Sequence, residues 1–265
     1  SPAIEIGLPA TAYTAAIVAT LGSAGDASPA TVPAAIVTVM VDVAYVTQLQ
    51  MHLAYDIAVL YRVPLDTSDK VITRSKSFDR SEVKLAGERK MNPIPGFDFG
   101  NSPGEFTREA VEGKTVLFTT TNGTGAFLAV QGARDVVVAS YVNFTAVLTM
   151  MRAAVRAGTD VSIICAGREK EFALEDAGCA GRYVRQLTTR TPEMEMNDAA
   201  RASELIAKRY GDRVDQLFAE SAHGHALWEA GYAEDLVTCA QIDSHAIIPI
   251  YQDRQITKLG PERER

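Results

Sequence analysis

The sequence has few cysteines, and they form no recognisable motif. Cys165, Cys179 and Cys239 are the three cysteines of the 265-residue chain, and no C-x-x-C pair occurs. An odd number without paired spacing argues against a disulfide framework and against a zinc site. The cysteines therefore favour a reducing, cytoplasmic environment.

Long apolar runs and basic runs are also missing. No stretch approaches the ~18–20 apolar residues of a membrane span. The segment "TAAIVATLG" near the start is too short for one, and no basic residue precedes it as in a signal peptide. The formal net charge is −7, without a Lys/Arg cluster, which argues against a nucleic-acid partner. These absences favour a soluble enzyme that acts on a small molecule.

Two nucleotide-binding motifs are absent as well. The sequence contains no G-x-x-x-x-G-K-[ST] loop. The "GTG" at 123–125 follows an apolar strand, but Leu128 occupies the third glycine position of a dinucleotide fingerprint. Neither a P-loop nor a dinucleotide site is expected.

Apolar segments of two periods alternate along the chain. Strands alternating with helices of ten to fifteen residues indicate βαβ units. Residues 34–265 are therefore expected to form an α/β domain, with a largely parallel sheet flanked by helices, as one unit or as two α/β lobes. Residues 1–33, rich in Ala, Thr, Ser and Pro, are expected to be weakly ordered or to hold a first strand. Strands are predicted at 34–43, 82–89, 115–120, 135–140, 160–167 and 245–253, and helices at 47–61, 123–133, 143–158, 174–188, 197–210 and 225–231.

The segment "TTTNGTG" lies between a predicted strand and a predicted helix. Ligands of such sheets bind beyond the carboxyl ends of the strands. Thr121 or Asn122 could cap the helix that begins near Gly123, and the free N–H groups of its first turn would favour an anion. A capped helix without a ligand is the alternative. An anion site at Thr121, Asn122, Gly123 and Thr124 is therefore one of two interpretations of this segment.

Three carboxylates and a histidine supply the remaining candidates. Asp42 ends a predicted strand, Asp98 lies in the glycine- and proline-rich loop "GFDFGNSP", and Glu175 opens a helix. Carboxylate oxygens are the ligands that Mg²⁺ prefers, although an acid at a helix start also stabilises the helix by itself. His223 lies at a turn before a helix and is either a general acid or a surface histidine.

Several motifs together resemble the 2-phosphosulfolactate phosphatase family. They are "LAGER", "IPGFDFGNSPGEF", "VLFTTTNGT", "ICAG", "LEDAGCAG" and "AHGHAL", which occur in the order of that family, roughly from Val37 to Asp253. The resemblance implies an enzyme of the α/β class. It implies that the enzyme uses Mg²⁺ to hydrolyse the phosphate ester of 2-phospho-3-sulfolactate in coenzyme M biosynthesis. Direct attack by water and a phosphoenzyme both remain open, as does a homo-oligomer.

The resemblance and the residues together give a predicted site. In this site, the carboxylates bind the metal or act as a base, and His223 protonates the leaving alkoxide. Because a loop carboxylate contributes little to a core, Asp98→Asn is predicted to lower the rate far more than the stability. The predicted catalytic residues are Asp42, Asp98 and His223; the substrate-binding residues are Thr121, Asn122, Gly123, Thr124, Arg89, Asn101 and Ser102; and the metal ligands are Asp42, Asp98 and Glu175.

The chain departs from the family pattern at two places. Where the family reads V-D-V-L-R-A-T-T-T, this chain reads "VDVAYVTQL", and Gly125 stands where the family has Arg or Lys. Each lost charge-assisted hydrogen bond costs about 1.5–3 kcal/mol. Weak turnover of phosphosulfolactate and better turnover of a less charged ester are therefore predicted. The alternative function is that of a non-catalytic relative that binds an anionic metabolite or acts in an assembly.

Overall fold

The structure is a computed structural model of the 265-residue chain. It describes residues 3–7, 37–41, 59–60, 72, 75–76, 78–123, 126–127, 130, 133–169, 171–253 and 255–259. Two of the predicted site residues, Asp42 and Thr124, lie outside these ranges, as does Gly125.

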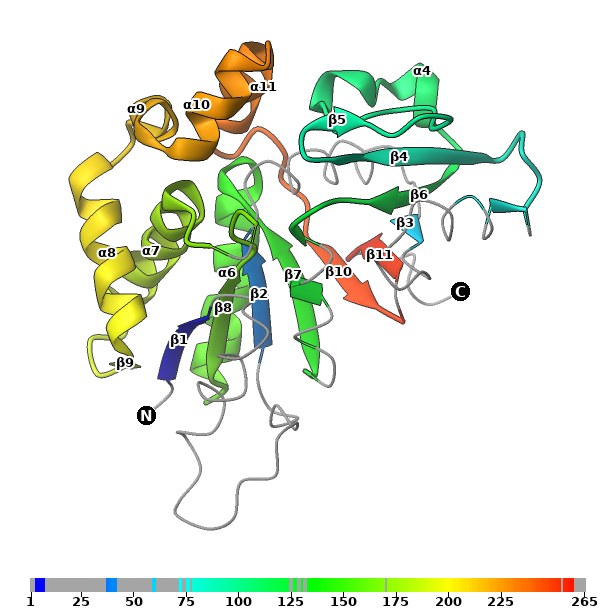
Figure 1. The fold of residues 1–265 in the computed structure, drawn as a ribbon. Coiled ribbons are helices and arrows are strands. Elements are labelled where there is room, and N and C mark those ends of the chain that lie inside the picture. The colour runs from blue at the N-terminus through cyan, green and yellow to red at the C-terminus, as the bar shows by residue number, and fades with distance from the viewer. Residues whose placement is uncertain are drawn as a thin grey trace, which may run out of the picture.

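The described strands join in one sheet (Figure 1). Their order across the sheet is β5-β4-β6-β3-β11-β10-β7-β2-β8-β1-β9. The strands are β1 (Ala3–Gly7), β2 (Val37–Val41), β3 (Val59–Leu60), β4 (Val83–Arg89), β5 (Asn92–Pro93), β6 (Thr115–Thr119), β7 (Asp135–Ala139), β8 (Val161–Cys165), β9 (Glu195–Met196), β10 (Pro249–Gln252) and β11 (Gln255–Lys258).

The sheet is mixed, with two parallel parts joined by a hairpin. Strands β7, β2, β8, β1 and β9 pair in parallel on one side, and β4, β6 and β3 pair in parallel on the other. Between them, β10 and β11 are antiparallel to each other and to their outer neighbours β7 and β3. The predicted α/β class is confirmed, but the sheet is mixed rather than largely parallel.

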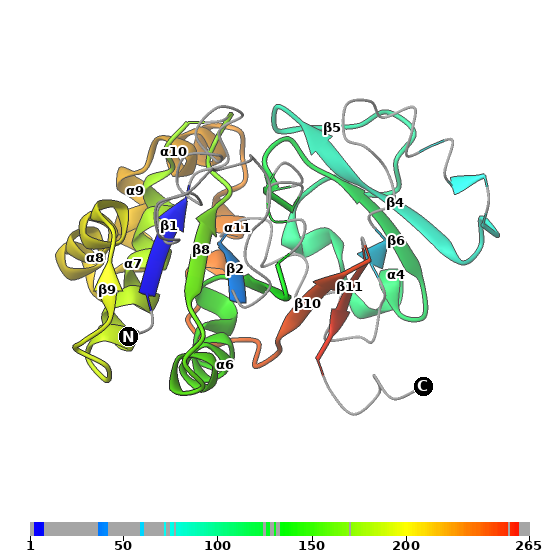
Figure 2. The same ribbon diagram turned by 90° about the horizontal axis from the view of Figure 1, so that it is seen from below.

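Most of the helices lie around the part of the sheet that is formed by β7, β2, β8, β1 and β9. Figure 1 shows α7 and α8 side by side, and α9, α10 and α11 above the ends of β2 and β8, while Figure 2 shows α7, α8 and α9 grouped beside β1, with α6 apart from them. The helices are η2 (Pro103–Glu105), α4 (Arg108–Val111), η3 (Tyr141–Asn143), α6 (Phe144–Arg156), α7 (Leu174–Thr188), α8 (Asp198–Tyr210), α9 (Val214–Glu220), α10 (Ala222–Glu229) and α11 (Ala233–Cys239). Within the part of the chain described here, no helix is long and apolar enough to cross a bilayer.

Of three apolar clusters among the described residues, two support the two parts of the sheet. The larger one gathers α6, α7 and β8, and in it the rings of Phe144 and Tyr183 lie 4.4 Å apart between centroids. The smaller one lies around Phe106 and Phe118, between the loop after β4 and strand β6. The loops that leave β4, β6 and β8 are thus held by rigid elements.

A glycine lets α7 and α8 pack closely. A Cβ atom placed on Gly181 would lie 1.8 Å from the backbone oxygen of Ser203 in α8. No side chain fits at that separation, so glycine at this position allows the two backbones to touch.

Some of the elements predicted from the sequence agree with the structure and others differ. The helix predicted at 174–188 coincides with α7, and the predicted first strand is β1. Of the helix predicted at 47–61, Val59 and Leu60 form strand β3 instead, and the other residues lie outside the described ranges. The boundary predicted after residue 33 also lies outside these ranges and stays a prediction.

Candidate active site

A cleft lies between the loops that follow β4, β6 and β8 and the helical segment α9–α11. Several predicted site residues line it, together with apolar side chains from the helical wall. The lining residues are Glu88, Lys90, Met91, Pro93, Asn101, Ser102, Pro103, Thr120, Thr121, Asn122, Arg168, Glu169, Glu175, Phe218, Ser221, His223, Gly224, Leu227, Tyr232, Asp235, Leu236 and Cys239.

Glu175 and His223 form a buried pair in this cleft. The Glu175 Oε1 atom lies 2.9 Å from Nδ1 of His223, and the Glu175 side chain is 8% exposed. Burial alone would raise the pKa of Glu175, but the hydrogen bond and charge of His223 outweigh it and hold this pKa below its ordinary value. The carboxylate is therefore ionised near neutral pH, and we assign the Nδ1 hydrogen to His223 on that basis. This leaves Nε2 as the nitrogen that can exchange a proton.

The elements explain why these two residues meet. Glu175 lies in the first turn of α7, directly beyond the loop after β8. His223 lies in the first turn of α10, where the Ser221 hydroxyl accepts a hydrogen bond from the Gly224 N–H at 2.9 Å and fixes the helix start. The starts of α7 and α10 thus position the Glu175 carboxylate and the His223 imidazole.

Glu88, at the end of β4, organises the turn after β6. Its Oε1 accepts from the Thr121 N–H at 2.7 Å and from the Thr120 hydroxyl at 3.0 Å. Its Oε2 accepts from the Met91 N–H at 2.9 Å and from the Thr121 hydroxyl at 3.0 Å. The Thr121 hydroxyl and N–H, which the sequence predicted as donors to an anion, are thus engaged by Glu88.

Asn122 joins the turn after β6 to the loop after β8. Its Oδ1 accepts a hydrogen bond from the Glu169 N–H at 2.8 Å. Gly123, which follows, is buried, and Gly123 and Asn122 remain predicted parts of the anion site. The contact shows a positioning role for the Asn122 side chain that the sequence did not indicate.

Asn101 and Ser102 bring the predicted loop "GFDFGNSP" to the cleft. The Ser102 hydroxyl donates to Asp235 Oδ1 of α11 at 2.7 Å, so the loop contacts the helical wall. Burial raises the pKa of Asp235, and nearby Glu105 adds to this, against the lowering effect of the Ser102 hydrogen bond. The Oδ1 atom of Asn101 is buried and has no hydrogen-bond partner among the described residues.

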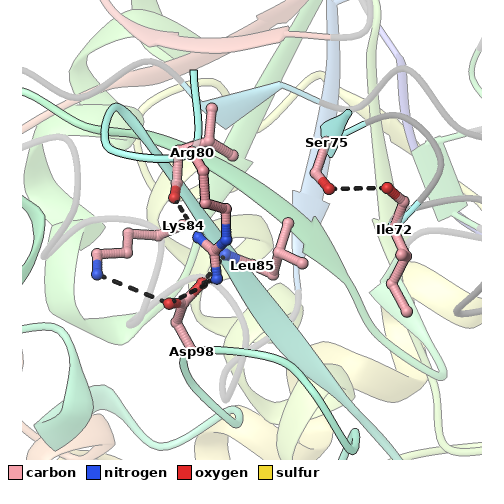
Figure 3. Close-up of polar contacts among 7 residues, drawn as sticks. Ile72, Ser75, Arg80, Lys84, Leu85 and Asp98 are labelled. Atoms are coloured by element: carbon pink, nitrogen blue, oxygen red, sulfur yellow. Dashed lines mark hydrogen bonds and ion pairs between the residues drawn. The ribbon is translucent and has the colours of Figure 1, made fainter. Parts of the chain in front are cut away.

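Asp98 and Arg89 do not line the cleft. Figure 3 shows the Asp98 carboxylate among Arg80, Lys84 and Leu85. Arg80 Nη2 donates to both oxygens at 2.8 and 2.9 Å, and the Leu85 N–H donates to Oδ2 at 2.8 Å. Arg89 donates to its neighbour's carbonyl oxygen and to the Thr119 hydroxyl. The catalytic role of Asp98 and the substrate role of Arg89 stay predictions, without support from this geometry.

The oxygen atoms in the cleft meet only some of the requirements of a Mg²⁺ site. Among the residues that the structure describes, no three His, Cys, Asp or Glu side chains gather as a metal site. However, Oε2 of Glu175 is buried without a partner in the described part of the chain, like Oδ1 of Asn101. Mg²⁺ commonly uses one or two carboxylates together with substrate oxygens and water. Glu175 and Asn101 thus each offer an oxygen of a suitable kind, whereas both oxygens of Asp98 are engaged by other residues and Asp42 lies outside the described residues. The metal ligands stay predictions.

These observations define a class of protein. The chain is an α/β protein with a cleft at loops that follow sheet strands, lined by an acid–imidazole pair, by charged side chains of both signs and by an apolar wall. A family model described as 2-phosphosulpholactate phosphatase matches residues 26–254. The chain belongs to this family.

Curated relatives agree with the family match. A "Probable 2-phosphosulfolactate phosphatase" of Caldanaerobacter subterraneus subsp. tengcongensis is 37% identical over 187 residues, which is 71% of this chain and 76% of that protein. Proteins of the same name from Symbiobacterium thermophilum and Clostridium acetobutylicum are 36% and 33% identical, over 74% and 73% of this chain and 83% and 80% of their own lengths.

Proposed function

We propose that the protein is a phosphatase that hydrolyses a phosphate monoester in this cleft, with 2-phosphosulfolactate as the first substrate to test. The observation that carries the proposal is the Glu175–His223 pair, because it places a proton-exchanging nitrogen in the cleft. Membership of the family supports the reaction class.

The chemistry follows from the pair. As a new bond forms between phosphorus and water, or a side chain that water later frees, the bond between phosphorus and the ester oxygen breaks. The leaving alkoxide takes a proton from Nε2 of protonated His223, and the proton that the attacking water loses restores the histidine. The ionised Glu175 holds the ring through Nδ1 and leaves Nε2 for the transfer. The apolar wall of Phe218, Leu227 and Leu236 limits water around the reacting group.

A divalent cation completes the proposal. Glu175 Oε2 and Asn101 Oδ1 would hold Mg²⁺, which when bound would neutralise charge on the phosphoryl oxygens. We expect EDTA to abolish phosphate release and added Mg²⁺ to restore it. Full activity in excess EDTA would remove the metal from the proposal and leave the histidine pair in place. A cytoplasmic location and a place in coenzyme M biosynthesis extend the same proposal.

The test compares two histidines of one helix. His223→Asn removes the proton donor, and phosphate release should fall about 10²–10⁴-fold, the usual contribution of a positioned acid. His225→Asn serves as the matched control, because His225 is exposed and does not line the cleft. Equal rates for both variants would contradict the proposed role of His223.

The substrate itself needs a separate comparison. The rates on 2-phosphosulfolactate should be compared with the rates on a phosphate ester whose alcohol part carries no charged group. The comparison would show whether the absent family cations limit the charge that the cleft accepts. Tight binding of either compound without turnover, in the presence of Mg²⁺, would favour the alternative of a non-catalytic binding protein.

A further inference from the structure

The cleft carries more acidic than permanently basic side chains. The titratable lining residues, apart from His223, Tyr232 and Cys239, are four carboxylates and two permanent cations: Glu88, Glu169, Glu175 and Asp235, with Lys90 and Arg168. A phosphoryl group with a charge of about −1.5 to −2 would be repelled by most of this surface. Besides the proposed metal ion, a cation of the lining is therefore expected beside its binding position.

Arg168 lies on a backbone turn that is fixed from three directions. Its N–H donates to the Glu171 carbonyl oxygen at 3.1 Å, and the Glu171 N–H donates back to the Arg168 carbonyl oxygen at 2.8 Å. The preceding Gly167 has a φ of 71° and donates its N–H to the buried Asp176 carboxylate at 2.8 Å. On the other side, the Glu169 N–H donates to Asn122. The turn is thus tied to α7 and to the turn after β6.

The guanidinium of Arg168 is anchored at one end only. Its Nη1 donates to the carbonyl oxygen of Ala222 at 3.1 Å, and the structure gives the guanidinium no other acceptor among the described residues. Ala222 directly precedes His223, so the charge is held at the start of the helix that carries the proposed proton donor. Lys90, by contrast, is an exposed side chain.

We propose that Arg168 binds the phosphoryl group that is transferred, an inference that rests on the proposed function. Three observations support this assignment: the Thr121 hydroxyl and N–H are engaged by Glu88, the Arg168 turn contacts Asn122, and the guanidinium binds the carbonyl oxygen of the residue before His223. A guanidinium can donate two parallel N–H bonds to a phosphate, which an ammonium cannot. Arg168 holds the phosphorus oxygens while His223 faces the ester oxygen.

The test measures inorganic phosphate binding by calorimetry with Mg²⁺ present, because binding of the product does not require turnover. Arg168→Met should weaken phosphate affinity about 10- to 100-fold, the usual loss for a charge-assisted bond. Arg168→Lys should recover part of the affinity, since it keeps the charge but not the fork. Arg201→Met, at an exposed site of α8 away from the cleft, is the matched control and should bind as the wild type does.

The outcomes separate this inference from the proposed function. Phosphate affinity unchanged in Arg168→Met, with thermal unfolding also unchanged, would overturn the role of Arg168 even if the wild type is an active phosphatase. Absence of phosphate binding by the wild type would overturn it too. Arginine-dependent phosphate binding by a protein that hydrolyses no ester would support Arg168 and refute the proposed phosphatase.

Discussion

Replacing Asp98 with asparagine tests whether this carboxylate serves the reaction or the fold. The sequence alone predicts that Asp98→Asn lowers the rate far more than the stability. The structure leads to the opposite expectation, because the carboxylate ties its loop to β4 through Leu85 and Arg80 and does not line the cleft.

The magnitude follows from the partners of the two oxygens. The Arg80 side chain is 56% exposed, so this ion pair contributes about 0–1 kcal/mol after screening by solvent. The bond from the buried Leu85 N–H weakens when its acceptor loses the charge, by about 1 kcal/mol. Asp98→Asn should therefore lower the free energy of unfolding by about 1–2 kcal/mol. Asp98→Ala leaves the Leu85 N–H without its acceptor and should cost about 2–4 kcal/mol in total.

The pH dependence has a defined sign. Burial alone would raise the pKa of Asp98, but the Leu85 N–H, the Arg80 hydrogen bond and the charges of Arg80 and Lys84 together lower it. A carboxyl whose pKa is lowered in the folded state stabilises the fold above its ordinary pKa and loses this contribution as the pH falls through the folded value. The difference between wild type and Asp98→Asn should thus be largest near neutral pH and shrink in acid, below the ordinary carboxyl pKa.

Urea unfolding of the three proteins at neutral and acidic pH measures these differences as shifts of the midpoint at constant slope. Phosphate release per folded molecule, measured in the same preparations, should stay within a few-fold of wild type for Asp98→Asn. A variant with wild-type stability and no turnover would refute this reasoning and support a catalytic Asp98.

Two further predictions concern close contacts of the scaffold. Gly181→Ala should destabilise the protein by at least about 2 kcal/mol in urea unfolding, because its Cβ would meet the Ser203 backbone oxygen at 1.8 Å; an unchanged midpoint would show that α7 and α8 can separate without cost. Glu88→Gln should cost about 1–3 kcal/mol, because either amide orientation sets its NH₂ group against the N–H of Met91 or of Thr121; a stable variant would mean that the turn rearranges freely.

Local sequence patterns predicted the elements well but not their arrangement. The apolar, β-branched segments at 115–120, 135–140 and 160–167 correspond to β6, β7 and β8, and the amphipathic stretch at 174–188 is α7. Strand β11 was missed, although the polar Asp253, with a φ of 52°, turns the chain between Tyr251 and Ile256 as in a hairpin. Pairing between segments far apart in sequence depends on tertiary packing, which periodicity does not report.

The site was predictable as a set of residues but not as a set of contacts. Position after a strand selected Asn122, and position at a helix start selected Glu175 and His223; all three line one cleft. The pairing of Glu175 with His223 bridges 48 positions of sequence, and nothing in either local pattern indicates it. Asp98 shows the converse, because a fixed loop carboxylate suits a salt bridge as well as a metal.

The β10–β11 hairpin has a consequence for the order of folding. The two parallel parts of the sheet have no direct strand pairing in the described chain except through these two strands, which end at Lys258. During synthesis, β3 and β7 leave the ribosome more than a hundred residues before β11 and β10, the strands that pair with them. Each part must wait with an unpaired strand edge, which is a template for association with other chains. Late, long-range pairing of this kind is slow, so the nascent protein should depend on chaperones until its last strands are made.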